Sequence, residues 1–553
     1  MRYEQTTLPV WSLLSGESGE TLRHYMHTVP HLKPWQVVGR LVAPVQRWVG
    51  RHTLPAPPSA LSDRLQPSVS MLRHHPWNAR RRVLAGRFRF LGKEAALGRP
   101  VDWAAPQRSL LWRFFLHYFH YLHALAPQEQ VALCRDWMAA NPVGSDVGWH
   151  PYPTSLRLVN WCTAQLPAPD VRASLYRQAA YLSRTVETHV YGNHLLENAR
   201  ALLVAGCALR GQGEAPRWAA QGRALYRAEV EKQILADGFH YERSPMYHAL
   251  MLHGVLDVLN VWPGGADAWP ELQQRARAMT AALATVTHPD GRLALFNDAV
   301  HEVAPPPARL HRYAQSVVGE CPPARSTLPS AGYYVVDADD VWLMIDGGAA
   351  GPEHLMAHAH ADAFSYELSL FGDRFVVDSG VYEYAAGPMR DYVRSTAAHN
   401  TVQVDGHDQM ECWDSFRVAR RTAPRGVVWR RTPTGAFFKG ELRLLEGGGV
   451  HRRRIRVEME ARRLSVHDML AGTGTHRAES RIHLHPQVRV QCDGEGALLQ
   501  RGAHRCRLVP TAGHLRREEG WYCPRFGERL RRPVLVVAAA GALPLRCGYE
   551  VRY

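Results

Sequence analysis

The stretch Cys321-Pro-Pro-Ala-Arg-Ser-Thr-Leu-Pro-Ser-Ala-Gly-Tyr-Tyr-Val-Val-Asp337 marks a change of hydrophobic period in this 553-residue chain. From about residue 108 to 317, before the change, apolar residues recur at helical spacing. After it, short runs alternate with a period of two, as in β-strands. Its prolines, together with Pro305–Pro307, are typical of an interdomain linker. The chain is therefore predicted to place helices first and a large β domain second.

The helical half contains many segments of similar length with short breaks. Residues 110–122 are apolar around most of the helix circumference, which predicts a buried helix. Short connectors between similar helices predict antiparallel hairpins packed as a bundle, solenoid or toroid. Further helices are predicted at 128–140, 153–165, 170–188, 193–211, 215–235, 244–262 and 268–287.

Beyond residue 330, many short strands separated by turn residues predict an antiparallel β-sandwich. Residues 83–105 are loop-like with a short hairpin, and residues 1–75 are expected to form a helical arm or cap. The expected domains are thus 1–75, 76–317 and 318–553. Strands are predicted at 332–337, 341–346, 364–370, 374–378, 401–405, 463–467 and 533–538.

The composition indicates a globular, basic protein. Hydrophobic residues make up 46% and charged residues 21% of the chain, and the net charge is +15. A basic balance favours a polyanionic partner, either nucleic acid or an acidic polysaccharide. No nucleic-acid-binding motif accompanies the arginines, so nucleic acid is not expected as a partner. Arginine-rich composition is also common as plain genomic bias, so the net charge alone does not decide whether it has a functional meaning.

The cysteines and the N-terminal residues indicate the cellular compartment in which the protein is expected. The nine cysteines form no CxxC pair, which argues against a disulfide framework and a cysteine zinc site. No apolar signal-peptide region opens the chain, and no run of 18 or more apolar residues follows. We therefore expect a cytoplasmic protein without a membrane span, with a periplasmic location as the alternative. The oligomeric state is left open.

The β half begins with a run of ionisable side chains that otherwise alternates like a strand. Residues two apart on a strand point to the same face of the sheet. We therefore expect His358, His360 and Asp362 to line one surface. Asp378 and His399 are expected to join them from neighbouring strands. This arrangement is typical of a metal or catalytic site built on a sheet.

Three motifs in this order resemble the heparinase II/III family of polysaccharide lyases. The likeness covers about residues 80–420 and implies an α/α toroid followed by an antiparallel β-sandwich. Residues 112–121 and the segment Trp149-His-Pro-Tyr-Pro-Thr-Ser-Leu-Arg-Leu-Val-Asn-Trp resemble a branch often associated with exopolysaccharide gene clusters. The motifs are Tyr191-Gly-Asn-His-Leu-Leu-Glu-Asn-Ala, Asp237-Gly-Phe-His-Tyr-Glu-Arg-Ser-Pro-Met-Tyr-His, and His358-Ala-His-Ala-Asp with His399-Asn-Thr-Val.

The resemblance implies cleavage of a uronic-acid-containing anionic glycan by β-elimination. The reaction removes the proton at C5 of the uronate and expels the glycosidic oxygen at C4. Because the C5 proton is weakly acidic, the carboxylate must be neutralised so that the enolate-like transition state is stabilised. A base must then reach C5, and an acid must protonate the leaving oxygen.

By this resemblance, Asn193, Tyr247 and His358 are the expected catalytic residues. Asn193 resembles the residue that neutralises the carboxylate, although asparagine is also a preferred helix N-cap. Tyr247 resembles the catalytic tyrosine, and His358 the histidine that acts as base or acid depending on substrate stereochemistry.

A phenol with its usual pKa of about 10 needs nearby positive charge to act as a base at neutral pH. Arg243 and His248 are the candidates to supply that charge to Tyr247. Glu242 is expected to hold Arg243 in place. A tyrosine at helical spacing is otherwise most often a core or rim residue.

Further residues are assigned to substrate and metal. Zinc is the expected ion, in a structural role, and no organic cofactor is expected. A hydrogen-bonded network without metal is the alternative for the same residues. Tyr382 and Arg390 are expected to reach the cleft. Asn297 and Asp298 are expected either to be structural or to support the site residues from behind. The expected substrate-binding residues are His194, Glu197, Arg243, Tyr384 and Arg394, and the expected metal ligands are His360, Asp378 and His399.

Two other functions remain open on the sequence. A glycoside hydrolase on the same scaffold would need a suitably spaced pair of acids, for which Glu197, Glu242, Asp298 and Asp362 are available. A non-catalytic glycan-binding or assembly protein is the second alternative. The lack of an export signal argues against heparin or alginate as the physiological substrate.

Overall fold

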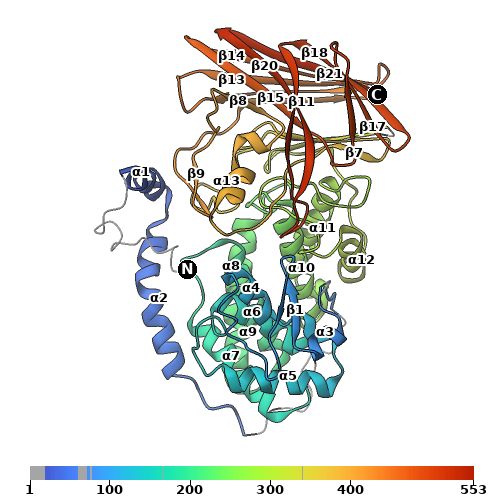
Figure 1. The fold of residues 1–553 in the computed structure, drawn as a ribbon. Coiled ribbons are helices and arrows are strands. Elements are labelled where there is room, and N and C mark those ends of the chain that lie inside the picture. The colour runs from blue at the N-terminus through green and yellow to red at the C-terminus, as the bar shows by residue number, and fades with distance from the viewer. Residues whose placement is uncertain (1–18, 60, 62–70, 75–76, 165, 339) are drawn as a thin grey trace.

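The computed structural model describes residues 19–59, 61, 71–74, 77–164, 166–338 and 340–553. A helical domain lies below a set of β-sheets, and one helical arm stands beside the helical domain (Figure 1). The remaining parts of the predicted arm lie outside the described residues. So do the N-terminal residues on which the predicted location rests. Within the described ranges no helix has both the length and the apolar character needed to cross a membrane.

The predicted toroid of helical hairpins is confirmed. Most of its helices start at a proline or have one in the first turn, where the missing N–H is not needed for helical hydrogen bonding. The helices are α1 Gly19–Thr28, α2 Pro34–His52, α3 Arg80–Leu84, α4 Leu110–Tyr118, α5 Pro127–Ala140, α6 Pro151–Thr163, α7 Pro169–Arg184, α8 Gly192–Ala208, α9 Ala215–Gln233, α10 Pro245–Val261, α11 Pro270–Thr285, α12 Pro307–Val318 and, within the β domain, α13 Pro388–Arg394.

The predicted helix at 110–122 is broken in the structure. Phe119 adopts a left-handed conformation with φ of 61°, which ends α4. A short 3-10 helix, His120–Ala124, continues the chain in a new direction. The prediction that this segment is buried is confirmed, since Trp112, Phe119 and Tyr121 are all buried.

The β domain is built from antiparallel strands, as predicted. Its three main sheets have the strand orders β3-β4-β5-β6-β7, β19-β20-β15-β8 and β11-β12-β13-β14-β21-β18-β17-β16. Residues 83–105 contain the expected hairpin, β1 Arg87–Phe90 with β2 Lys93–Ala96. The other strands are β3 Thr327–Leu328, β4 Tyr333–Ala338, β5 Val341–Asp346, β6 Tyr366–Leu370, β7 Asp373–Val376, β8 Val402–Val404, β9 Cys412–Trp413, β10 Arg417–Val418, β11 Arg425–Thr432, β12 Gly435–Arg443, β13 Val450–Glu458, β14 Arg463–Ala471, β15 Thr475–His483, β16 Arg489–Cys492, β17 Ala497–Arg501, β18 His504–Ala512, β19 His514–Tyr522, β20 Leu530–Ala542 and β21 Leu545–Arg552.

The five-stranded sheet joins the two domains. Side chains alternate between the two faces of a strand, and both faces of β4 and β5 are buried. Tyr333 and Val335 pack into the core of the helical domain. Their neighbours Tyr334 and Val336 pack into the core of the sandwich. One sheet therefore belongs to two cores and fixes the domains against each other.

The predicted strand carrying His358, His360 and Asp362 is not formed. These residues lie in a loop, and β6 begins only at Tyr366. The loop backbone bonds to other irregular segments instead of a strand ladder. The N–H of Asp298 donates to the carbonyl of His358 at 3.1 Å, and the N–H of His360 donates to Oδ1 of Asn297 at 3.1 Å.

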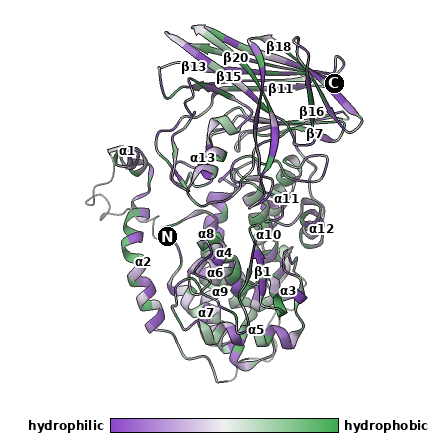
Figure 2. Cartoon of the chain, in the orientation of Figure 1, coloured by the Kyte–Doolittle hydropathy of each residue, from purple (hydrophilic) through white to green (hydrophobic). Residues whose placement is uncertain are grey.

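The arm helix α2 lies against the segment between α7 and α8. A Cβ atom on Gly39 would fall 2.4 Å from Cβ of His189, and one on Gly50 would fall 2.8 Å from Cγ2 of Thr185. Glycine at both positions therefore allows the close approach. Figure 2 shows that α2 carries hydrophobic and hydrophilic residues along its length. The helix exposes six large apolar side chains, those of Trp35, Val38, Leu41, Val45, Trp48 and Val49.

Candidate active site in the interdomain cleft

A cleft of about 1190 Å³ lies between the helical domain, the arm and the β domain. Residues from α2, α4, α6, α8 and α10 line it, together with β-domain loops around 355–358, 382–386 and 414–417. All three expected catalytic residues are in its wall: Asn193 and Tyr247 from the helical half, and His358 from the β half.

Asn193 lies in the first turn of α8 and is not the N-cap. The cap position is Tyr191, and Gly192 is the first helical residue. The backbone N–H and side-chain amide of Asn193 both donate to the carboxylate of Glu242, at 2.9 and 3.0 Å. A Cβ atom on Gly192 would fall 2.2 Å from that carboxylate, so the site requires glycine there.

Glu242 links Asn193 to the histidine. Oε2 of Glu242 lies 3.4 Å from Nε2 of His358. Burial alone would raise the pKa of Glu242, but His240, His358 and the Asn193 donors outweigh it and lower the pKa. The prediction that Glu242 holds Arg243 in place was therefore wrong. The carboxylate of Glu242 faces α8 and the cleft instead.

Tyr247 and His358 meet face to face. Their ring centroids are 3.9 Å apart and their planes are 27° from parallel. The phenol oxygen of Tyr247 lies 3.3 Å from that of Tyr384, which comes from the loop before α13. Burial, followed by Tyr384, raises the pKa of Tyr247 well above its usual value. This phenol is therefore protonated at neutral pH.

The cations expected to activate Tyr247 point elsewhere. His248 is buried, and its Nε2 pairs with the carbonyl of Met279 at 2.9 Å. The guanidinium of Arg243 donates to backbone carbonyls in the β domain, including that of Gly351 at 3.3 Å. The positive φ of Arg243, 56°, turns its side chain away from Glu242.

Asp298 anchors the histidine loop. Its Oδ2 lies 2.9 Å from Nδ1 of His358, and its Oδ1 lies 2.9 Å from Nε2 of His360. Both oxygens also accept hydrogen bonds from Arg390. Burial alone would raise the pKa of Asp298, but Arg390, His358 and His360 outweigh it and hold the pKa well below its usual range. Because Asp298 occupies Nδ1 of His358, only Nε2 of that ring is directed to the cleft.

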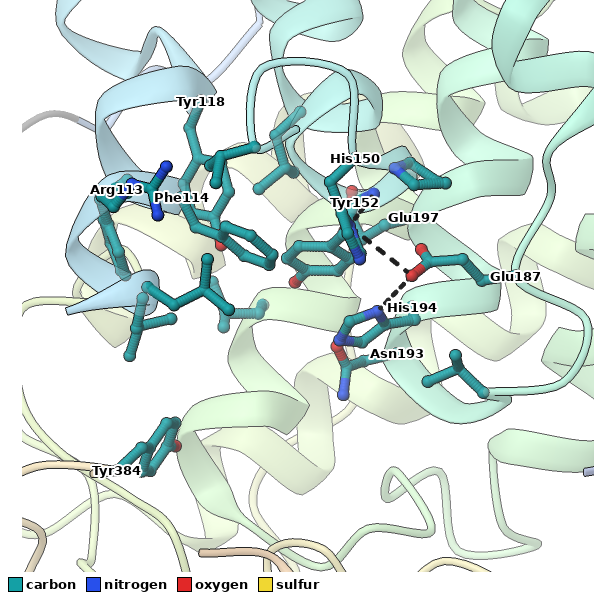
Figure 3. Close-up of a pocket in the computed structure, with 18 of the residues that line it drawn as sticks. Arg113, Phe114, Tyr118, His150, Tyr152, Glu187, Asn193, His194, Glu197 and Tyr384 are labelled. Carbon is teal, nitrogen blue, oxygen red and sulfur yellow. Dashed lines mark hydrogen bonds and ion pairs between the residues drawn. The ribbon is translucent and has the colours of Figure 1, made fainter. Parts of the chain in front are cut away.

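A second titratable cluster lies deeper in the cleft (Figure 3). His194 is the only residue of α8 that is not fully buried. Its Nδ1 lies 3.2 Å from Oε1 of Glu187, and His150 lies 3.9 Å from the same oxygen. The ring of Tyr152 stacks on His194 with centroids 4.1 Å apart. His194, an expected substrate-binding residue, therefore pairs with Glu187 at the cleft surface.

Glu197 lines the cleft wall and is neutralised there. Arg200 donates to its carboxylate at 2.8 Å and also bonds Asp257. The hydroxyl of Tyr313 donates to Asp257 at 2.8 Å. Glu197 therefore belongs to a buried ion network that stiffens the wall, and its charge is already balanced within the protein.

Two expected substrate contacts lie outside the lining residues of the cleft. Arg243 joins the domains, as described above. Arg394 is buried and donates to the carbonyls of Ala359, Asp414 and Arg417 at 3.2, 3.0 and 3.0 Å. Both arginines fix loop backbones. Tyr382 lines the cleft as expected, whereas Arg390 lies behind it on Asp298.

The expected metal ligands lie together behind His358. Nδ1 of His399 pairs with Oδ2 of Asp378 at 2.7 Å, and the His360 and His399 ring centroids are 5.3 Å apart. Nδ1 of His360, Nε2 of His399 and Oδ2 of Asp362 are buried without a hydrogen-bond partner. Among the described residues, no three such side chains already form a group arranged to hold a metal ion. Two imidazole nitrogens and a carboxylate oxygen nevertheless have the donor chemistry that zinc prefers.

Comparison with known proteins identifies the family. The chain matches the model "Heparinase II/III N-terminus" over residues 128–315 and "Heparinase II/III-like, C-terminal" over residues 321–546. The chain belongs to the heparinase II/III family. The two matches together cover most of the helical domain and nearly all of the β domain.

Curated relatives of this heparinase II/III-family protein include heparin-sulfate lyases. That of Pedobacter heparinus is 25% identical over 374 residues, covering 57% of this chain and 55% of the relative. That of Bacteroides stercoris is 25% identical over 304 residues, covering 48% of this chain and 45% of the relative. The chain thus spans about half the length of the curated relatives that it matches.

Solved structures support the fold of this heparinase II/III-family protein. A crystal structure of heparinase III has a TM-score of 0.69 at 16% identity, covering 95% of this chain and 91% of the other. A heparan sulfate lyase from Pedobacter heparinus has a TM-score of 0.59 at 20% identity, with coverages of 93% and 88%. At these identities the likeness concerns the fold alone.

Sequence reasoning missed several cleft residues of this heparinase II/III-family protein. Glu187 and His150 come from separate segments and carry no motif that would pair them. Three arginines of α2, namely Arg40, Arg47 and Arg51, also line the cleft. Their spacing of seven and four residues places them on one side of a helix, which is a signal that the sequence did contain.

Proposed function

We propose that the protein is a polysaccharide lyase that cleaves a uronic-acid-containing glycan by β-elimination. The observation that carries the proposal is the stacking of His358 on Tyr247, beside Asn193, in one cleft. These three side chains supply a base, an acid and an amide donor, which are the groups that the reaction needs. Family membership and the heparin-sulfate lyase relatives support the same chemistry.

Asn193 has the amide that neutralises the uronate carboxylate. One of its amide N–H groups is held by Glu242, which fixes the plane of the side chain. The second amide N–H is then free to donate to a substrate carboxylate. Hydrogen bonding there stabilises the negative charge that spreads onto the carboxylate when C5 loses its proton.

His358 is the proposed base and Tyr247 the proposed acid. Nε2 of His358 takes the C5 proton while Asp298 holds the opposite side of the ring. The C5–H electron pair forms the C4–C5 double bond, and the bond from C4 to the glycosidic oxygen breaks. The phenol of Tyr247, kept protonated by burial, gives its proton to that leaving oxygen. The products are an unsaturated uronate and a new hydroxyl on the leaving sugar.

The proposed substrate is an acidic polysaccharide. The basic residues on the α2 side of the cleft favour an anionic chain. The relatives are named for heparin sulfate, whereas the segment 149–161 resembles a branch linked to exopolysaccharide gene clusters. A glycosaminoglycan and an acidic exopolysaccharide are both members of the proposed substrate class.

We also propose that a zinc ion stabilises the loop behind His358. His360 and His399 would bind it through their unpartnered nitrogens, with the free oxygen of Asp362 nearby. Asp378 would fix the ring of His399 through Nδ1, in the role that carboxylates commonly have beside metal-bound histidines. Such an ion supplies rigidity to the loop, and no proton transfer depends on it.

The hydrolase alternative is not favoured by the cleft. Glu197 is paired with Arg200, Glu242 with Asn193, and Asp298 with Arg390. Asp362 is buried and does not line the cleft. None of the four acids proposed for hydrolysis is therefore free to act as one of a pair flanking a glycosidic bond.

The deciding experiment incubates the protein with a panel of acidic polysaccharides, including heparan sulfate, polyuronates and bacterial exopolysaccharides. A lyase produces the ultraviolet absorbance of an unsaturated uronate together with new reducing ends. New reducing ends without that absorbance would indicate a hydrolase. Neither product on the whole panel would contradict an enzymatic function on uronate polymers.

A further inference from the structure

Three arginines form a row along the cleft side of α2. At 100° per residue, positions 40, 47 and 51 fall within about 40° of one another around the helix. The row extends over about 16 Å of helix at a rise of about 1.5 Å per residue. All three side chains line the cleft together with Trp48, whereas the exposed apolar residues Trp35, Val38, Leu41, Val45 and Val49 lie outside its lining.

The row has no counter-charge of its own. Within the described part of the chain, none of Arg40, Arg47 and Arg51 forms an ion pair, and the hydrogen bond of the Arg40 guanidinium runs to the backbone carbonyl of Gln36. The nearby carboxylates of Asp146 and Glu187 are taken by Arg113 and His194. Arg51 is exposed, and Arg40 and Arg47 are partly buried in the cleft wall. The row therefore presents three positive charges that an anion from outside can neutralise.

Arg40 is partly buried beside another arginine, Arg417. Burial and the neighbouring charge of Arg417 lower the pKa of Arg40 to about 10. Arg417 belongs to β10 and follows Phe416, whose ring contacts the ring of His358 edge to face at 6.3 Å. The first arginine of the row is therefore close to the proposed catalytic end of the cleft.

Arg47 and Arg51 lie progressively farther along α2 from the proposed catalytic end of the cleft. Arg47 lies near His150, His189 and Tyr181, whose pKa values it affects electrostatically. The aliphatic part of Arg51 contacts Gly144 at the far end, where a Cβ atom would fall 2.9 Å from Cδ of Arg51. The arginines thus follow the cleft for a length that suits several sugar units.

We propose that Arg40, Arg47 and Arg51 form an extended anion-binding subsite that holds carboxylate or sulfate groups of an acidic polysaccharide beyond the sugar cleaved at His358. This inference rests on the proposed lyase function. Guanidinium groups suit it because they bind carboxylate and sulfate oxygens in a two-pronged geometry and stay charged at all physiological pH values. The subsite lies on α2, outside the residues matched by the family models, which begin at residue 128.

The test measures binding separately from turnover. Full-length protein carrying Tyr247→Phe, which removes the proposed acid, is titrated with heparan sulfate oligosaccharides and oligouronates of graded length. We expect the triple variant Arg40→Gln, Arg47→Gln, Arg51→Gln to lose about tenfold or more in affinity for long chains. The loss should shrink for disaccharides, which are too short to reach the row, and the salt dependence of binding should weaken. In the active protein the loss should appear mainly as a higher KM for long chains.

A charge-matched control distinguishes binding at the subsite from general electrostatic attraction between a basic protein and an anionic chain. The triple variant Arg454→Gln, Arg456→Gln, Arg489→Gln removes three exposed arginines from the β-sandwich and should bind like the parent. Arginine-to-lysine changes at the row should restore part of the affinity, and circular dichroism should show an intact fold. Equal losses in both triple variants, or no loss in the row variant, would overturn the subsite while leaving the lyase proposal intact. Failure of the parent to bind or cleave any acidic chain would overturn both.

Discussion

The imidazole of His358 lies over the phenol ring of Tyr247, with ring centroids 3.9 Å apart. One residue comes from the β domain and the other from the helical domain, so the pair exists only when the two domains are joined. The proposed base and acid are thereby held against each other through their ring faces. Both can contact a sugar that enters from the cleft.

The first prediction concerns the proposed acid. Tyr247→Phe removes the phenol proton but keeps the ring stacked on His358, so turnover should fall by about 10²-fold or more. The melting temperature should change little. Initial rates of unsaturated uronate formation on the best substrate of the panel measure the effect. Tyr384→Phe is the matched control, because it removes a neighbouring phenol and should cost much less; the reverse order would reassign the acid to Tyr384.

The second prediction concerns Asp298 as the residue that positions His358. Asp298→Asn leaves Arg390 buried without a full counter-charge, and breaking such a pair typically costs about 3–5 kcal/mol. Urea denaturation should show this loss in the free energy of unfolding. Asp414→Asn, at a partly exposed carboxylate 3.8 Å from Arg417, should cost far less. An unchanged stability for Asp298→Asn would show that the carboxylate does not anchor the loop.

The third prediction concerns pH and Glu187. Burial alone would raise the pKa of Glu187, but His194 and His150 outweigh it and lower the pKa from 4.5 to about 2. A depressed carboxyl pKa stabilises the fold above the unfolded pKa, and this stabilisation is lost as the pH falls from about 4.5 to about 2. Its full size is on the order of 3 kcal/mol.

Comparison of the parent with Glu187→Gln measures this contribution. The difference in their free energies of unfolding should be largest near pH 6 and should fall by about half or more near pH 3. Chemical denaturation at the two pH values gives both differences. A gap that stays constant with pH would mean that the charge of Glu187 does not stabilise the fold.

The fourth prediction concerns zinc. If His360 and His399 bind the ion, a chelator should lower the melting temperature of the parent, and elemental analysis should find zinc before treatment. His360→Ala should lose the zinc and also lose its response to the chelator. His358→Ala should keep both while losing turnover. A chelator response that persists in His360→Ala would place the ion elsewhere.

The sequence predicted the fold well because hydrophobic period is a local property. Each helix and strand is encoded in its own residues, and the period change near residue 330 marks the start of the β domain. Residues 358–362 were predicted wrongly as a strand because their alternation arises from side-chain contacts within a loop. His358 and His360 both reach Asp298, whereas Asp362 is buried without a partner at Oδ2.

It was harder to predict which site residues pair with one another than to predict which residues belong to the site. Tyr191 and Arg243 have φ values of 65° and 56°, and each turns the chain sharply next to a proposed site residue. The turn at Arg243 sends Glu242 toward Asn193 and the arginine toward the β domain. No spacing rule contains such turns, so the expected pair of Glu242 with Arg243 was wrong.

The sheet shared by two cores limits how this protein can be divided. Removing everything after the linker would leave the helical core without Tyr333, Val335 and their neighbours, and would open an apolar surface to water. The isolated sandwich would be uncovered in the same way. Neither half is then a self-sufficient folding unit, and a chain cut near residue 320 should aggregate or unfold, whereas the whole chain should melt in one cooperative transition.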